Sequence, residues 1–251
     1  MKNHGEPNTW DVTLVTDMSC LFCEMENFNA PIDQWNTSQV TDMNSMFQGA
    51  SSFNQPFTMD TSKVIDMSFM FFNASSFNQP LTMDTSKVIN MECMLNAAES
   101  FNQPITWDTS HVTDMNNMFA DATSFNQSIT MDTSNVINMN SMFSGADSFN
   151  QPITMDTSQV INMSGMFDGA SSFNQPLTMD TSQVTDMSYM FGASSFNQPL
   201  TMDTSKVTNM NSMFYDASSF NQPITMDTSK VENMKEMFEG AWAMTHPKPS
   251  L

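Results

Sequence analysis

The chain has 251 residues, with 27 acidic residues against seven lysines and no arginine, so its formal charge is −20. This balance argues against a nucleic-acid partner, because contacts to phosphates need a basic surface, and against binding to an anionic membrane surface. No apolar run exceeds four residues, which rules out a transmembrane helix and the core of a signal peptide. The 29 methionines supply the apolar volume that the few Leu, Ile and Val residues do not, so the chain can fill a core.

A repeat of 24 residues organises the whole chain. The Phe-Asn pair that marks it begins at Phe28, Phe53, Phe77, Phe101, Phe125, Phe149, Phe173, Phe196 and Phe220. Ten copies fill residues 10–244, between short tails at residues 1–9 and 245–251. A period of this length indicates stacked units that cannot bury their apolar faces alone, so we expect a single solenoid domain of ten coils.

The first two copies carry local features of their own. Cys20 and Cys23 form a lone CxxC pair without the second ligand pair that a zinc site needs, and Cys93 makes the number of cysteines odd. We interpret the pair as small apolar fillers rather than as a disulfide framework. The second copy has one extra residue within residues 32–35, which a β-bulge would absorb.

The regular copy, such as residues 64–87, contains two patterns. Apolar residues recur every three or four positions over residues 64–77, which favours a helical or 3-10 segment that faces the core. Residues 81–84 then alternate apolar and polar after Pro80, which is typical of a short half-buried strand. We therefore predict that each coil holds one short parallel strand and one short helical or 3-10 segment. In residues 191–193 one residue is missing between Phe191 and Ala193, which shortens the following turn.

Methionine and asparagine form regular columns. A Met-x-x-Met pair can bind Cu(I) through its thioethers. Every methionine of the pairs, however, falls at one of the apolar positions of the repeat, so we assign these methionines to the core. We expect the asparagine after each repeat phenylalanine to satisfy backbone groups at a turn, as stacked asparagines can.

The polar residues of the strand segment are the candidate binding site. Threonine and aspartate alternate with the buried residues there, so they share one face of the solenoid. The candidate residues are Thr58, Asp60, Thr82, Asp84, Thr106, Asp108, Thr130, Asp132, Thr154, Asp156, Thr178, Asp180, Thr201, Asp203, Thr225 and Asp227. Two roles are open for the aspartates: each caps its own turn, or the column binds Ca²⁺ weakly with oxygen ligands from successive coils.

A second acidic column and a basic column flank this face. Asp66 and its equivalents are replaced by asparagine in half of the copies, which favours a cap over a charge-dependent role. Lys63 and its equivalents follow the aspartates of the candidate site by three residues, so we expect local charge compensation. Other positions vary from copy to copy, such as Phe69 and Tyr189 in one column and Phe72 and Asp168 in another.

Enzyme signatures are missing from the sequence. It contains no P-loop, no dinucleotide-binding glycine turn, no nucleophile elbow and no histidine pair at metal-ligand spacing. Lone His111 has no nucleophile pattern beside it. We therefore predict neither an enzyme nor a cofactor.

The repeat resembles that of the BspA-type leucine-rich-repeat surface proteins, in a variant family of unknown function. Copies such as residues 107–119 match its Trp-Asp-Thr-Ser-x-Val-Thr-x-Met-x-x-Met-Phe pattern closely, although seven copies have Met in place of Trp. The resemblance covers nearly the whole chain. It implies a leucine-rich-repeat-like solenoid and a location outside the cell or on its surface, although this chain shows no signal peptide or anchor.

The function expected from these features is non-catalytic binding or adhesion, with a protein or a glycan recognised through one solenoid face. A constant face suits a repetitive target and a variable face suits one irregular protein. Three alternatives remain open. They are a structural protein that self-associates, a binder of a lattice such as ice, and a calcium binder that uses the Thr/Asp columns.

Overall fold

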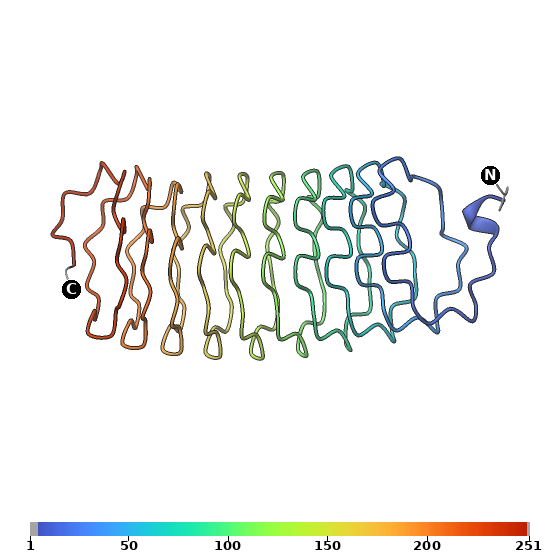
Figure 1. Cartoon of the computed structure of the whole chain (residues 1–251), viewed down its shortest axis with the longest axis horizontal. Helices are drawn as coiled ribbons and strands as arrows, with labels where there is room; N and C mark the ends of the chain where they lie inside the picture. Colours follow the sequence, from blue (N-terminus) through green and yellow to red (C-terminus); the bar gives the residue numbers. More distant parts are fainter. Residues whose placement is uncertain (1–4, 250–251) are drawn as a thin grey trace.

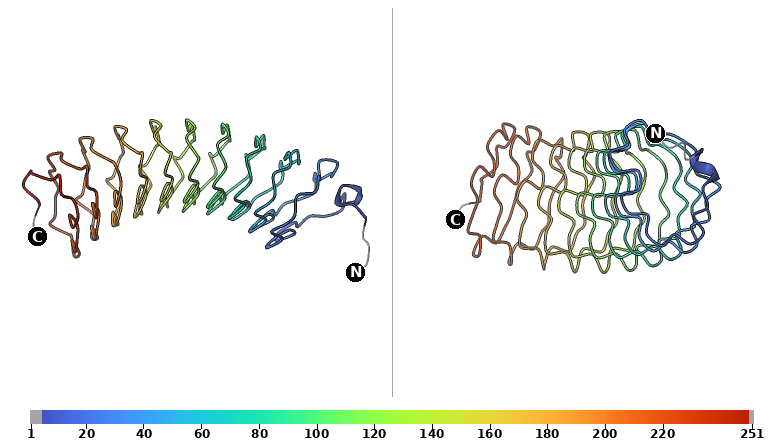
Figure 2. Two further views of the ribbon diagram at one scale, coloured as in Figure 1. Left: turned by 90° about the horizontal axis from the view of Figure 1, so that it is seen from above. Right: turned by 45° about the vertical axis from the view of Figure 1, so that its right-hand side comes forward.

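The computed structural model describes residues 5–249 and is a stack of similar coils (Figure 1). Seen from the side, the stack is a gently curved rod with the two chain ends at opposite tips (Figure 2). Residues 1–4 and 250–251 of the expected tails lie outside the described residues. The repeat predicted from the sequence is thus confirmed as the unit of the fold.

Regular secondary structure is nearly absent from the described residues. They contain one 3-10 helix, η1 (Pro7–Thr9), which starts at a proline, and no strand. Trp35 from the second coil donates its indole N–H to the carbonyl oxygen of Pro7 at 2.8 Å, so η1 packs on the stack. No helix in residues 5–249 is long and apolar enough to cross a membrane.

The segment expected to be helical is instead a run of tight turns, which we call the meander (residues 67–74 and their equivalents). In one copy, Met70 donates its N–H to the Met67 oxygen and Ala74 donates to the Phe71 oxygen, each closing a turn of four residues. The third residue of each turn has a left-handed backbone, with φ of 57° at Phe69 and 55° at Asn73. Residues in this conformation interrupt a helix, so the predicted helical segment is wrong.

Alternate backbone groups of the meander bond to the next coil. The N–H groups of Met67, Phe69, Phe71 and Asn73 donate to carbonyl oxygens of the following coil at 2.8–3.1 Å. This pattern repeats along the stack, and a continuous series of parallel bridges runs through the Asp/Asn column from Asp17 to Asn233. The apolar spacing of three and four therefore correctly indicates a segment that faces the core, but its N–H groups alternate between bonds to the next coil and bonds that close turns within the coil.

The expected strands do not form a continuous ladder. Only the pairs Phe57–Leu81 and Ile129–Ile153 make isolated bridges there, among the described residues. A proline stands just before this segment in most copies and has no N–H to donate, which weakens backbone pairing at that point. The segment is extended but is joined to its neighbours mainly through side chains.

Two side-chain columns make these connections. The threonine of each Asp-Thr-Ser turn is buried and donates its hydroxyl to the aspartate carbonyl of the next coil, as Thr133 does to Asp156 at 2.8 Å. The asparagine after each repeat phenylalanine accepts the backbone N–H of its equivalent in the next coil, as Asn126 does from Asn150 at 3.0 Å. The structural role predicted for the asparagines is confirmed. For the threonines, the sequence pattern predicts a turn but not this bond between coils.

The core consists of stacked columns of identical side chains. Most methionines of the Met-x-x-Met pairs and the valine before them are fully buried, which confirms the core assignment. Two phenylalanine columns stack face to face along the rod. Phe119 and Phe143 have parallel rings 5.6 Å apart, and Phe125 and Phe149 lie 5.9 Å apart.

Both irregular copies differ from expectation. The extra residue in residues 32–35 forms a turn closed by Trp35 N–H to the Ile32 oxygen, so no β-bulge is present. In the short copy Ala193 occupies the left-handed position, with φ of 47°, and Ser194 takes the buried alanine position. The missing residue therefore falls after this position, at a serine next to the repeat phenylalanine, and not between Phe191 and Ala193.

Candidate functional site

The sixteen candidate residues lie together on one exposed face, which we call the Thr/Asp face. In the third coil Thr58 and Asp60 are exposed while Phe57 and Met59 between them are buried. Every candidate residue from Thr58 to Asp227 is exposed, and the apolar residues beside it are buried up to the seventh coil and half-buried in the last three. The predicted sharing of one face is confirmed, whereas its use in binding stays a prediction.

Each aspartate of this face caps its own turn. Asp132 Oδ1 accepts the backbone N–H of Ser134 at 3.0 Å and its hydroxyl at 2.6 Å. Equivalent backbone bonds of 2.9–3.0 Å occur from Asp60 to Asp227. These donors, the serine hydroxyl first, lower the pKa of Asp132, and the neighbouring Asp108 and Asp156 raise it only as minor effects. The cap role is therefore confirmed.

The repeated carboxylates give a direct test of the calcium alternative. Residues 5–249 contain no group of three or more His, Cys, Asp or Glu side chains placed to hold a metal ion. We expect CaCl₂ and NaCl at matched ionic strength to raise the melting temperature equally, because both screen a like-charged column. A saturable increase that is specific to CaCl₂ and is removed by EDTA would contradict this. Asp132→Asn should not change the difference between the two salts.

The second acidic column has the same local role. Asp66 Oδ1 accepts the N–H of Ser68 at 2.8 Å, and Asn90 Oδ1 accepts that of Glu92 at 2.9 Å. Aspartate and asparagine therefore serve equally, as the alternation in the sequence predicted.

The lysine column compensates charge only weakly. Lys63 donates to Gln39 at 3.0 Å, and its charge is a minor cause of the lowered pKa of Asp60.

A second face is formed by the meander and varies between coils. Two positions, three residues apart, hold different residues from coil to coil, and we call them together the variable face. Most of their side chains are at least partly exposed, while Cys93, Ala120 and Ser212 are buried. The first position is held by Cys20, Ser45, Phe69, Cys93, Asn117, Ser141, Gly165, Tyr189, Ser212 and Glu236. The second is held by Cys23, Gln48, Phe72, Asn96, Ala120, Ser144, Asp168, Gly192, Tyr215 and Glu239.

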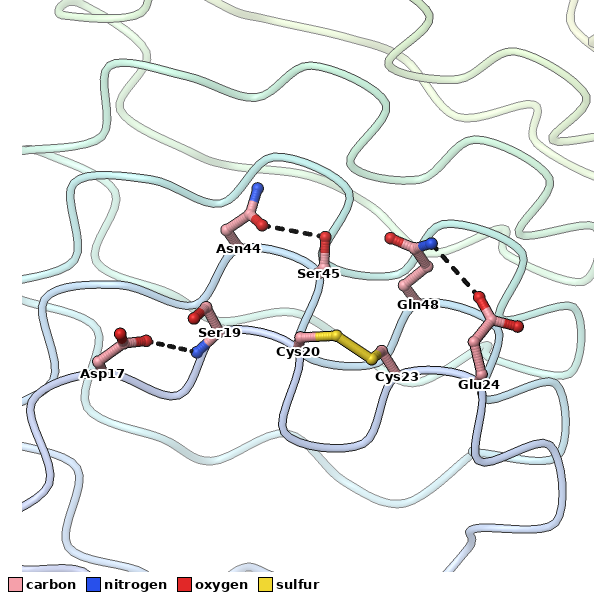
Figure 3. The surroundings of a disulfide bond; sticks show 8 residues. All are labelled: Asp17, Ser19, Cys20, Cys23, Glu24, Asn44, Ser45 and Gln48. Carbon is pink, nitrogen blue, oxygen red and sulfur yellow. Dashed lines mark hydrogen bonds between the residues drawn. A yellow bond between two sulfur atoms is a disulfide. The ribbon is translucent and has the colours of Figure 1, made fainter.

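The cysteines of the first coil are not apolar fillers. Cys20 and Cys23 form a disulfide with Cα atoms 4.7 Å apart, and Ser45 and Gln48 lie beside them on the next coil (Figure 3). The turn that Cys23 N–H closes on the Cys20 oxygen brings the two residues within disulfide reach. Cys93 is buried in the same column, and burial raises the pKa of its thiol to about 11.

Thiol labelling should separate these cysteines. We expect iodoacetamide to modify no cysteine of the oxidised native protein. After reduction it should modify Cys20 and Cys23, and Cys93 should react only on unfolding, because the thiolate is the nucleophile and burial disfavours it. Mass spectrometry of the alkylated peptides gives the result. Labelling of native Cys93 at the rate of the reduced pair would contradict the burial of its side chain.

Comparison with known families places the whole stack in one group. The model of a family described as "Mycoplasma protein of unknown function, DUF285" matches four overlapping stretches, residues 2–106, 81–155, 104–200 and 153–250. Each stretch spans several coils, in keeping with a repeat that the family shares. No curated protein matches the chain.

Proposed function

This chain belongs to the family described as "Mycoplasma protein of unknown function, DUF285", and we propose that it is a non-catalytic binding or adhesion module. Within this proposal the coils are a variant of the BspA-type leucine-rich-repeat solenoid, and the protein works at the cell surface or outside the cell. Its partner is a protein or a glycan that contacts one face of the rod.

The observation that carries the proposal is the separation of a uniform core from two different outer faces. The interior columns hold nearly the same residues in every coil, so they serve stability. The Thr/Asp face presents the same pair of exposed side chains in eight successive coils, which suits a target with a repeated structure. The variable face presents different side chains in each coil, which suits one irregular partner.

Several features support a binding role over catalysis. Nearly identical coils produce nearly identical surroundings, whereas an active site needs unlike groups that converge. The aspartates of the Thr/Asp face are occupied by their own turns, and their lowered pKa makes them poor proton donors or acceptors near neutral pH. Rigid solenoids instead offer long surfaces on which partners bind.

The proposal is tested by binding of the labelled protein to arrays of glycans and of extracellular proteins. We expect saturable binding to at least one target class. A triple variant with Thr106→Tyr, Thr130→Tyr and Thr154→Tyr should abolish it if the Thr/Asp face is used. Ile137→Tyr, on a neighbouring edge where the native side chain is 47% exposed, is the matched control. Absence of saturable binding to either class would contradict the proposal.

The periodic threonines favour one second candidate, a lattice binder. Exposed threonines at the same position of successive coils form a regular row, as binding to a crystal surface requires. Thermal hysteresis of the purified protein would support this candidate, and its absence would remove it.

Self-association, the third candidate, predicts a sedimentation coefficient that rises with protein concentration.

A further inference from the structure

A small hollow interrupts the variable face in the seventh coil. Its volume is about 280 Å³, and its walls come from three successive coils. The lining residues are Asn140, Ser141, Ser164, Gly165, Asp168, Ser188 and Tyr189. The size suits one chemical group rather than a drug-sized ligand.

One glycine leaves the space open, and a second makes room for the Asp168 carboxylate. Gly165 occupies the first position of the variable face, where the other nine coils carry a side chain. Gly192 lies in the next coil, where an added Cβ would collide with Asp168 Oδ1. No other coil combines a glycine at the first position with an acid at the second. The hollow is therefore particular to this coil and not a consequence of the repeat.

Three of the five side-chain donor groups around the hollow are already used. Ser188 donates its hydroxyl to Asp186 at 2.6 Å, and Ser164 donates its hydroxyl to Asn162 at 2.8 Å. Asn140 donates its amide N–H to the Ser164 oxygens at 2.5 and 2.8 Å. What remains toward the hollow is the Asp168 carboxylate, the lone pairs of the bonded oxygens and the hydroxyls of Ser141 and Tyr189, which can rotate to accept hydrogen bonds.

Asp168 adds a charge that the protein does not compensate. Among the described residues no hydrogen bond or ion pair to its carboxylate is found, and burial raises its pKa to about 6. The other titratable group of the lining is Tyr189. The carboxylate of the nearby Asp186 accepts the hydroxyl of Ser188. A half-buried carboxylate without a partner is destabilising until a cation or a donor reaches it.

We infer that this hollow binds a primary alkylammonium group, such as the head of a lysine side chain or a free amine. An ammonium has three donors and no acceptor, which matches a wall of acceptor oxygens around one carboxylate. Tyr189 is 42% exposed at the rim, so its ring can contact the cation from the side. The formal charge of −20 also attracts cations to the protein. The inference rests on the proposed binding function and names one subsite for it.

The test is a titration of the isotopically labelled full chain, followed by amide chemical shifts. The first probe is Nα-acetyl-lysine methylamide, and the control probe is Nα-acetyl-norleucine methylamide, which lacks the ammonium. We expect saturable shifts at Gly165 and Gly192 with the lysine probe at millimolar concentration and none with the norleucine probe. Equal shifts with both probes, or none with either, would overturn the inference, while array binding by the whole protein would still stand.

Variants locate the binding. Asp168→Asn should weaken binding of the lysine probe by at least about tenfold, because a charge-assisted hydrogen bond is lost. Gly165→Asn should fill the hollow and abolish binding, and Asn117 holds the same left-handed position in another coil with φ of 52°, so the fold accepts it. Asp121→Asn, an exposed acid outside the hollow, is the matched control. Equal binding by Asp168→Asn and the native chain would overturn the inference.

The source of the ammonium is distinguished by a second probe. Tighter binding of 1,4-diaminobutane than of the lysine probe would support a free amine, and the reverse would support a lysine side chain of a partner. Either result supports recognition of an ammonium group. A probe that bound with the same affinity to Gly165→Asn would contradict the assigned place.

Stability gives a readout without any ligand. The raised pKa of Asp168 means that its ionisation costs stability in the folded chain. This cost is absent below pH 3.8, the ordinary pKa of an aspartate, grows as the pH rises toward 6 and is complete above it. Asp168→Asn should therefore raise the melting temperature at pH 7.5, and the gain should vanish near pH 4. An equal gain at both pH values would show that the carboxylate is not desolvated.

Discussion

Replacing Phe143 by alanine is expected to lower the free energy of unfolding by about 3–5 kcal/mol, the usual cost for a fully buried phenylalanine. Its ring has no exposed area and contacts three others. Ring centroids lie 5.6 Å away in Phe119, 5.8 Å in Phe167 and 4.4 Å in Phe149. The variant thus opens a cavity in the middle of both phenylalanine columns. Urea unfolding followed by circular dichroism gives the value.

The chain supplies a matched control for this variant. Leu95 stands in the same column as Phe143, one coil before Phe119, and is fully buried. Phe143→Leu should therefore cost much less than Phe143→Ala, since the column already accommodates a leucine. Thr130→Ala, on the exposed Thr/Asp face, should change stability by less than about 0.5 kcal/mol. A loss below about 1 kcal/mol for Phe143→Ala would mean that stacked rings do not hold the coils together.

The core and the exposed columns could be predicted because they depend only on periodicity. A side chain that recurs every 24 residues at an apolar phase must be buried in any stack, whatever backbone carries it. The same holds for Thr58 and Asp60, which alternate with buried neighbours and are exposed. Turn capping by Asp60 followed from the Asp-Thr-Ser sequence, whose chemistry is local.

The backbone of the meander could not be predicted from the same pattern. A spacing of three and four fits a helix and a chain of four-residue turns equally. The distinguishing feature is the left-handed backbone at positions held by Phe69 and Tyr189, bulky residues that rarely adopt it. Hydrogen bonds to the next coil offset that strain, and such bonds are visible only when two coils are placed together.

The disulfide and the hollow depend on the same hidden geometry. Cys20 and Cys23 meet because a tight turn lies between them, and the apolar-filler interpretation missed it. Asp168 looked like one of many variable residues. Only the structure shows that Gly165 leaves an open space beside it and that its carboxylate packs against Gly192 of the next coil.

Replacing Asn126 by alanine is the second variant for which we expect a large effect, a loss of about 1–3 kcal/mol. Its Oδ1 accepts the backbone N–H of Asn150 at 3.0 Å and the side-chain amide of Gln151 at 3.1 Å. Its own N–H donates to Asn102 Oδ1 at 3.0 Å. Alanine would leave the Asn150 N–H without an acceptor at a point where no backbone pairing replaces it. Urea unfolding again measures the effect.

Aspartate at this position separates the hydrogen bond from the shape of the side chain. Asn126→Asp keeps an acceptor oxygen at the same reach, so it should retain most of the stability that Asn126→Ala loses. It also adds one negative charge to a chain that already carries −20, so added NaCl should raise its stability more steeply than that of Asn126→Ala. Equal losses for both variants would show that side-chain shape, rather than the accepted N–H, is what joins successive coils here. The asparagine column would then be a packing element, and the extended segments would depend on the buried threonines alone for their polar connection.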